Sequence, residues 1–167
     1  MLVIEHLDSD DDGLSSRAWY EAVVNKVVPP DELAPKLRRL LELLLSPSRE
    51  ARSLAWAAAA ELVITSTLPK DEVSTRKGAL IELLKTRGPS IDAFVRAWET
   101  AEKLAKVGAL SVDDLRPLSE LLWDMADRAT GKDKDRLKAV AERLRKAGLI
   151  KGPGLRARVL GEDSYIL

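Results

Sequence analysis

Apolar residues recur every three to four positions through most of the chain, a period typical of amphipathic helices. This pattern predicts seven helices, over residues 16–28, 31–46, 48–66, 70–87, 91–107, 112–129 and 133–147. Glycine and proline separate them, as at Pro29-Pro30 and Gly148, because proline cannot continue a helix and glycine accepts the left-handed end conformation. Ser90 and Ser111 are predicted N-caps. The predicted fold class is therefore all-α, with short loops that make successive helices antiparallel neighbours.

The charged and apolar patterns suggest three regions: an acidic N-terminal segment at 1–15, a helical domain at 16–150, and a basic tail at 151–167. In the tail, Arg156 and Arg158 alternate with Ala157 and Val159, which is the period of a strand or β-wing. Residues 1–7 have the composition to pair with this tail. A small β element formed by the two ends of the chain is thus left open.

Several short segments repeat along the chain. Ala55-Trp56 aligns with Ala97-Trp98 at an offset of 42 residues, and 101–108 matches 141–148 at an offset of 40. Trp19 belongs to a shortened first copy by the same alignment. A further trace is the triplet Glu-Leu-Leu, which occurs at 42–44, 82–84 and 120–122.

A period near 40 residues with two helices per unit resembles the HEAT and armadillo class of helical repeats. The resemblance implies a short right-handed α-solenoid of about three to four helical hairpins, in which each hairpin covers the apolar face of the one before. It also implies a non-catalytic scaffold that binds another macromolecule on its concave face. A compact orthogonal helical bundle is the alternative architecture.

Composition argues against several function classes. The 167 residues include 27 basic and 27 acidic side chains, no cysteine, and a single histidine, His6. Thiolate chemistry is therefore excluded, and histidine-based catalysis is poorly supplied. No P-loop, GxGxxG or HExxH motif occurs, so we expect neither an enzyme nor a cofactor.

The sequence also bears on location and origin. The longest nearly apolar run, 54–64, is far below the ~20 residues that span a bilayer. The first residues do not resemble a signal peptide, which favours a cytoplasmic protein without membrane contact. Glutamine is absent and Asn25 is the only asparagine, a depletion typical of thermophilic proteins and also of computationally designed chains.

The segment from Asp8 to Gly13 matches the first half of a calcium loop, with Asp8, Asp10 and Asp12 as candidate ligands. The closing half fails, because the position that needs a bidentate acid is Trp19. The other interpretation is a solvated acidic loop next to the positive N-terminal end of a helix. We expect no metal site, and calcium binding stays the less favoured alternative.

Charge is polarised between the two ends of the chain. Residues 132–158 carry ten basic and three acidic side chains, whereas residues 1–16 carry five acids and no base. The candidate partner-binding residues in the basic region are Lys134, Lys138, Arg143, Arg145, Lys146, Lys151, Arg156 and Arg158. They favour an acidic partner such as nucleic acid as the alternative function.

Large apolar side chains supply the other candidate surface. The helix predicted at 16–28 is apolar around much of its circumference, and Trp19 and Tyr20 are candidate contacts on a dimer or partner surface. Trp56 and Trp98, in contrast, are predicted to pack between helical hairpins. The function predicted from the sequence is a protein–protein interaction or assembly module, with a homo-oligomer among its partners.

Overall fold

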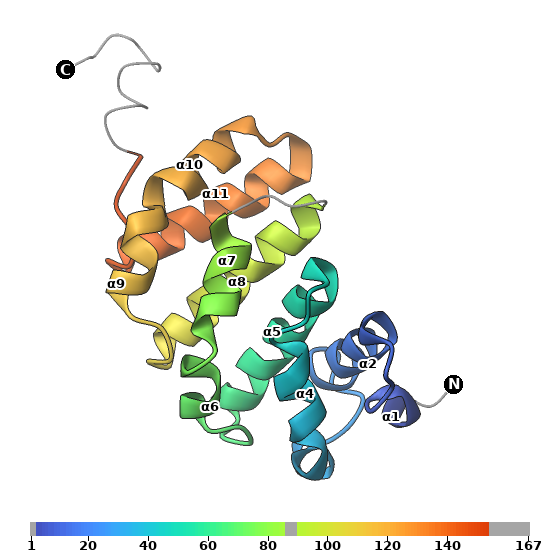
Figure 1. The fold of residues 1–167 in the computed structure, drawn as a ribbon. Coiled ribbons are helices and arrows are strands. Elements are labelled where there is room, and N and C mark those ends of the chain that lie inside the picture. The colour runs from blue at the N-terminus through green and yellow to red at the C-terminus, as the bar shows by residue number, and fades with distance from the viewer. Residues whose placement is uncertain (1–2, 86–89, 154–167) are drawn as a thin grey trace, which may run out of the picture. The chain divides into compact units, whose positions relative to one another are not determined.

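The computed structural model describes residues 3–85 and 90–153, and Figure 1 shows its helices. The chain divides into two compact units, Met1–Leu110 and Ser111–Leu167, which are described separately below. All regular structure in the described residues is helical. The predicted all-α class is therefore confirmed.

The first unit contains α1 (Val3–His6), α2 (Asp12–Val23), α3 (Pro30–Leu33), the 3-10 turn η1 (Ala34–Lys36), α4 (Leu37–Leu43), α5 (Arg49–Ile64), α6 (Lys70–Ser74), α7 (Lys77–Lys85) and α8 (Ile91–Lys106). The second unit contains α9 (Val112–Leu115), η2 (Arg116–Leu118), α10 (Ser119–Arg128) and α11 (Gly131–Lys146). In the first unit α5 packs against α2 and α8, and in the second α10 packs against α11 (Figure 1).

Three predicted helices are each broken near their start. The predicted helices at 31–46 and 112–129 contain Pro35 and Pro117, which fall in the 3-10 turns η1 and η2. Proline lacks the amide hydrogen that a helix needs and its ring clashes with the preceding turn. The helix predicted at 70–87 breaks between α6 and α7 without a proline.

The short helices before these breaks share one feature of packing. Each ends on or near a fully buried aliphatic side chain, namely Leu33 in α3, Val73 in α6 and Leu115 in α9. The break changes the chain direction after the apolar side chain has entered the core. The short helix can therefore bury its aliphatic side chain while its acidic first turn stays exposed, as at Asp31 and Glu32.

The long helices α2, α5, α8 and α11 end in the same way. The residue just past each end has a positive φ: Lys26 (58°), Ser66 (63°), Gly108 (83°) and Gly148 (78°), which are 40, 42 and 40 residues apart. The next amide donates to a carbonyl five residues back, as from Ala109 to Leu104 (2.9 Å) and from Leu149 to Leu144 (2.9 Å). This is the Schellman-type end that favours glycine.

Substitutions at two of these helix ends, Gly148→Ala and Ser66→Gly, are expected to change the free energy of unfolding in opposite directions. Gly148→Ala should lower the free energy of unfolding by about 1 kcal/mol, because a Cβ meets nothing within 4 Å and only backbone strain acts. Ser66→Gly should raise it by about 0.5 to 1 kcal/mol by relieving the same strain. Urea unfolding measures both changes.

Gly78→Ala is the matched control for these substitutions. Gly78 is exposed inside α7, has ordinary helical φ, and has open space around its Cβ position. The same chemical change should therefore stabilise the chain by about 0.5 to 1 kcal/mol, through helix propensity. Equal effects of Gly78→Ala and Gly148→Ala would contradict the role assigned to the left-handed ends.

The tryptophans of the long helices occupy matching places. Trp19, Trp56 and Trp98 each lie eight residues after the N-cap of their helix, and all three are fully buried. The indole Nε1 of Trp19 donates to the Leu7 carbonyl and that of Trp56 to the Leu44 carbonyl, both at 3.0 Å. The equivalent residue in α11, counted from Thr130, is Lys138, which is exposed.

The N-terminal segment differs from its prediction. Residues 3–6 form helix α1 rather than a strand, and Leu7 is fully buried with its carbonyl accepting from Trp19 and Ser15. Residues 3–15 therefore pack as part of the first unit, and residues 3–6, for which the sequence left β pairing open, are helical. The tail residues 154–167, including Arg156 and Arg158, lie outside the described residues.

Candidate interaction surfaces

The acidic segment predicted as a calcium candidate is occupied by contacts within the chain. Lys36 Nζ lies 2.8 Å from Asp8 Oδ2, and Arg39 Nη2 lies 2.8 Å from Asp12 Oδ1. Asp11 caps α2 by accepting from the Leu14 amide. In residues 3–85 and 90–153 no three acidic or histidine side chains are grouped as metal ligands. The described structure thus gives calcium binding by this segment no support.

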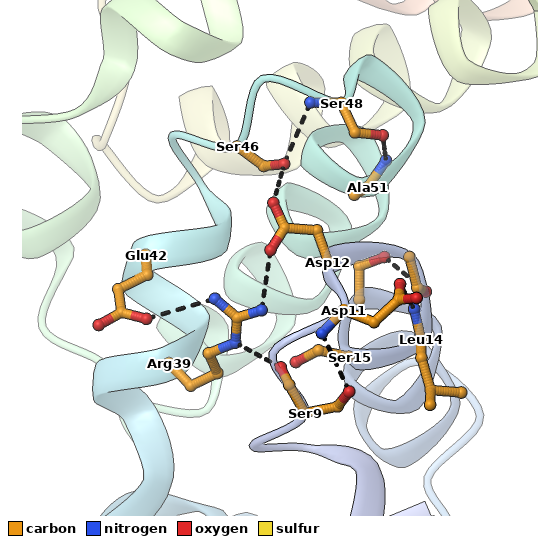
Figure 2. A network of polar contacts seen from close by, with 12 residues as sticks. Ser9, Asp11, Asp12, Leu14, Ser15, Arg39, Glu42, Ser46, Ser48 and Ala51 are labelled. Atoms are coloured by element: carbon orange, nitrogen blue, oxygen red, sulfur yellow. Dashed lines mark hydrogen bonds and ion pairs between the residues drawn. The ribbon is translucent and has the colours of Figure 1, made fainter.

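Asp12 is the centre of a polar network that joins the start of α2 to α4 and to the loop before α5 (Figure 2). Its carboxylate accepts from the Ser46 hydroxyl at 2.5 Å and from Arg39. Arg39 also donates from Nε to the Ser9 carbonyl at 3.0 Å. The hydrogen bond from Ser46, followed by that from Arg39, lowers the pKa of Asp12 below its usual value.

A second polar group lies across the surface of α5. Arg96 of α8 donates to Ser53 Oγ at 2.8 Å, and its guanidinium carbon lies 5.8 Å from the centre of the Tyr20 ring. This cation–π contact links α8 to α2 over α5. Tyr20, a predicted partner contact, is half-buried and already engaged within the chain.

Trp19 requires a correction. Its side chain is fully buried and its indole donates to Leu7, so it packs in the core and does not form part of a surface. The sequence placed it on a surface because α2 is apolar around its circumference. The structure covers that circumference with α1 and α5, so the residue is a packing side chain like Trp56.

Ion pairs also connect α5 to its other neighbours. Glu82 of α7 is paired with both Arg49 and Arg52 of α5, at 2.7 Å from Arg49 Nη1. The hydrogen bond from Arg49 is the largest cause of the lowered pKa of Glu82. Lys103 Nζ of α8 lies 2.6 Å from Glu61 Oε2 of α5. Many charged side chains of the first unit are thus paired with one another.

The predicted basic residues of the second unit lie mainly on α11. Lys138, Arg143, Arg145, Lys146 and Lys151 are exposed, and Lys134 is half-buried. Arg145 is paired with Glu142 at 2.7 Å, and this hydrogen bond lowers the pKa of Glu142 and raises that of Arg145. Lys134 Nζ donates to the Asp127 carbonyl at 3.3 Å. The structure therefore brings six of the eight predicted cations together on one helix and the turn after it.

The sequence did not predict a pair of hollows at the end of α5, the first lined mainly by apolar surface and the second by polar and apolar surface in similar amounts. The first, of about 160 Å³, lies between the ends of α2 and α5, where Val23, Val28 and Leu62 line it with Lys26. The second, of about 580 Å³, lies between the ends of α5 and α8, where Ile64 and Val107 line it with Lys70. We call this surface the turn edge, defined by the lining residues Val23, Lys26, Val28, Pro30, Leu33, Glu61, Leu62, Val63, Ile64, Thr65, Ser66, Leu68, Pro69, Lys70 and Val107.

Besides its two hollows, the turn edge has strained backbone and exposed apolar side chains. Its two residues past the helix ends, Lys26 and Ser66, hold positive φ without being glycine, a strained conformation for such residues. Val27, beside Lys26, is 52% exposed, and Ile64 is 45% exposed. The only sequence signal for this surface is the apolar character of the turn after α2, at 27–30.

Comparison with protein-family models, curated proteins and solved structures finds no match to this chain. None of the helices in residues 3–85 and 90–153 has the length and apolar character required to cross a membrane.

Proposed function

We propose that this chain is a non-catalytic helical-repeat module, similar to the HEAT and armadillo class, that binds a protein partner or assembles with one. The observation that carries the proposal is the four-fold recurrence of one helix end, at Lys26, Ser66, Gly108 and Gly148. Recurrence of a backbone conformation with its hydrogen bonds is a stronger sign of a repeat than recurrence of leucine or alanine. The finer architecture in this proposal is a short right-handed solenoid.

Buried positions support the same period. The residues at 33, 73 and 115 are buried aliphatic side chains, and so are those at 40, 80 and 122. Both sets have spacings of 40 and 42 residues, like the helix ends. In the first unit, the hollows place the end of α5 beside the ends of α2 and α8, so these three helices run in the same direction. Stacked helices of one direction are typical of solenoids and differ from an orthogonal bundle.

A protein partner is favoured by the distribution of charge. Basic and acidic residues are equal in number over the chain, and in the first unit Lys36, Arg39, Arg96 and Lys103 are paired with carboxylates. Nucleic-acid binding in contrast needs basic side chains that are available to phosphates. Nucleic acid is the second candidate function, favoured by the exposed cations of α11 such as Lys138 and Lys146.

Two measurements on the full chain test the proposal. Sedimentation velocity over a range of concentrations tests assembly, and capture on the immobilised chain at ~150 mM salt, with nuclease present, tests binding of another protein. We expect a protein to be retained, or a mass that rises with concentration. Salt-sensitive binding of mixed-sequence RNA or DNA that is lost in Lys138→Glu/Arg145→Glu, without either result above, would overturn the proposal in favour of the second candidate.

A further inference from the structure

The turn edge has the features of a binding site for an extended peptide segment. Its two hollows lie on either side of the end of α5, which contributes Leu62 to the first and Ile64 to the second. Their centres are therefore separated by about one helix diameter, ~10 Å. In a polyproline-type segment, side chains three residues apart lie on the same face and span a similar distance of ~9 Å.

The chemistry of the lining indicates the character of the segment. Val23, Val28 and Leu62 in the first hollow, and Ile64 and Val107 in the second, suit aliphatic side chains. The two depressions are separate, which suits two separate side chains better than a continuous helix face. The segment that fits has an aliphatic residue at each of two positions, three apart.

Charge at the turn edge favours an acidic segment. Lys26 lines the first hollow and Lys70 the second. The one carboxylate in the lining, Glu61, is already paired with Lys103 at 2.6 Å. Asp31, Glu32, Asp71 and Glu72 are exposed in the first turns of the following helices but do not line the hollows. Lys70 Nζ donates to the Val107 carbonyl at 3.4 Å. The charges of the two lysines in the lining complement carboxylates that flank the aliphatic side chains.

The backbone gives an independent reason to single out this surface. Gly108 and Gly148 occupy the left-handed position in the later copies, whereas Lys26 and Ser66 hold it at a conformational cost. Lys26 lines the first hollow and Ser66 the second. Strained residues cluster at sites where their side chains or backbone serve a function.

We propose that the turn edge binds an extended acidic peptide segment of a partner protein, with two aliphatic side chains three residues apart seated in the two hollows. This inference rests on the proposed interaction function and specifies its site. The proposed occupant of the turn edge is an unstructured segment of another protein. Binding of a second copy of this chain at the edge is a competing outcome.

The experiment uses a fluorescent peptide with a Leu-Pro-Glu-Leu centre and two glutamates on each side, titrated with the full chain at ~50 mM salt. We expect saturable binding with a dissociation constant of about 100 µM or tighter, as for a small interface. A peptide with serine in place of both leucines, and one with lysine in place of the glutamates, should each bind at least about tenfold more weakly.

Two variants of the chain locate the site. Lys26→Glu/Lys70→Glu should weaken peptide binding at least about tenfold, whereas the matched reversal Lys132→Glu/Lys138→Glu on α11 should change it less than about twofold. Ile64→Ser, on the exposed rim, should weaken binding without unfolding the chain, which circular dichroism checks. Lack of saturable binding up to ~1 mM, or equal binding by both reversal variants, would overturn the inference.

Failure of this inference and failure of the proposed function give different results. If the wild-type chain and Lys26→Glu/Lys70→Glu capture the same protein equally, the chain is an interaction module and the turn edge is not its site. If sedimentation shows a dimer that Lys26→Glu/Lys70→Glu dissociates, a second copy occupies the edge and the peptide proposal is wrong. If neither peptide nor protein is bound and the chain remains a monomer, both proposals fail.

Discussion

Trp56→Ala is expected to lower the free energy of unfolding by about 3 to 5 kcal/mol, the range for truncation of a fully buried large aromatic side chain. Trp56 lies in α5, the helix that packs against both α2 and α8, and has no exposed surface. Its loss leaves a cavity at the centre of the first unit. It also leaves the Leu44 carbonyl without the indole donor that lies 3.0 Å away. Chemical denaturation followed by far-ultraviolet circular dichroism measures the change.

Trp56→Phe separates the hydrogen bond from the packing. Phenylalanine retains most of the apolar volume but cannot donate to Leu44, so we expect a loss of about 1 to 3 kcal/mol. Trp123→Phe gives a comparison in the second unit, where the indole donates to the Lys151 carbonyl at 2.9 Å. A Trp56→Ala chain with wild-type stability would show that α5 is not the central packing element of the first unit.

Asp12→Ala is the substitution with the second largest expected effect, a loss of about 1.5 to 3 kcal/mol. The change removes the acceptor of the Ser46 hydroxyl and of Arg39 Nη2, both from elements far from α2 in the sequence (Figure 2). The Arg39 side chain is only 18% exposed, so its guanidinium loses a partner in a place with little water. Asp10→Ala, in the exposed loop just before α2, is the control and should change stability by less than ~0.5 kcal/mol.

The effect of Asp12→Ala should depend on pH. Because hydrogen bonds from Ser46 and Arg39 lower the pKa of Asp12 in the folded chain, the unfolded chain binds more protons in the acidic range. The stabilisation by this carboxylate is then complete above the unfolded pKa, near 3.8, and is lost as pH falls through the folded pKa. The stability difference between wild type and Asp12→Ala should stay constant from pH ~7 to ~5 and decrease below ~4. A difference that grows in acid would contradict the assignment.

Much of the helix content followed from the sequence because the signals are local. Ser90 caps α8 by accepting from the Ala93 amide, and Gly108 and Gly148 end α8 and α11. Ser48, which the sequence analysis did not single out, caps α5 by accepting from the Ala51 amide. The predicted helices at 48–66 and 91–107 therefore lie within two residues of α5 and α8. Ser111 with Asp114 forms a capping box in which each side chain accepts from the backbone amide of the other residue.

The breaks inside the helices were missed because apolar periodicity continues across them, both at the 3-10 turns η1 and η2 and at the turn between α6 and α7. The Glu-Leu-Leu triplet at 120–122 is a second case in which the apolar pattern misleads. The buried positions that match Leu40 and Leu80 include Leu122, and those that match Leu44 and Leu84 include Ala126. The triplet at 120–122 therefore lies about one helical turn before the positions that match 42–44 and 82–84. One turn leaves its residues on a similar face of the helix, so the spacing of leucines alone does not reveal the mismatch.

Candidate surfaces were predicted less well than helices, since exposure depends on which elements pack together. Tyr20 had the composition of a surface contact, but Arg96 of α8 lies over its ring. Asp8 and Asp12 had the spacing of cation ligands, but Lys36 and Arg39 occupy them. None of these partners is near in sequence, so local patterns contain no information on the pairing.

By itself, the sequence determined the helical class and the helix ends marked by Ser90, Ser111, Gly108 and Gly148. These depend on backbone preferences and on interactions within a few residues. Only the tertiary structure decided that Trp19 is core, that Asp8 and Asp12 are paired with Lys36 and Arg39, and that two hollows flank the end of α5. Each of these requires side chains from different helices to meet in space, which happens only after the helices have packed.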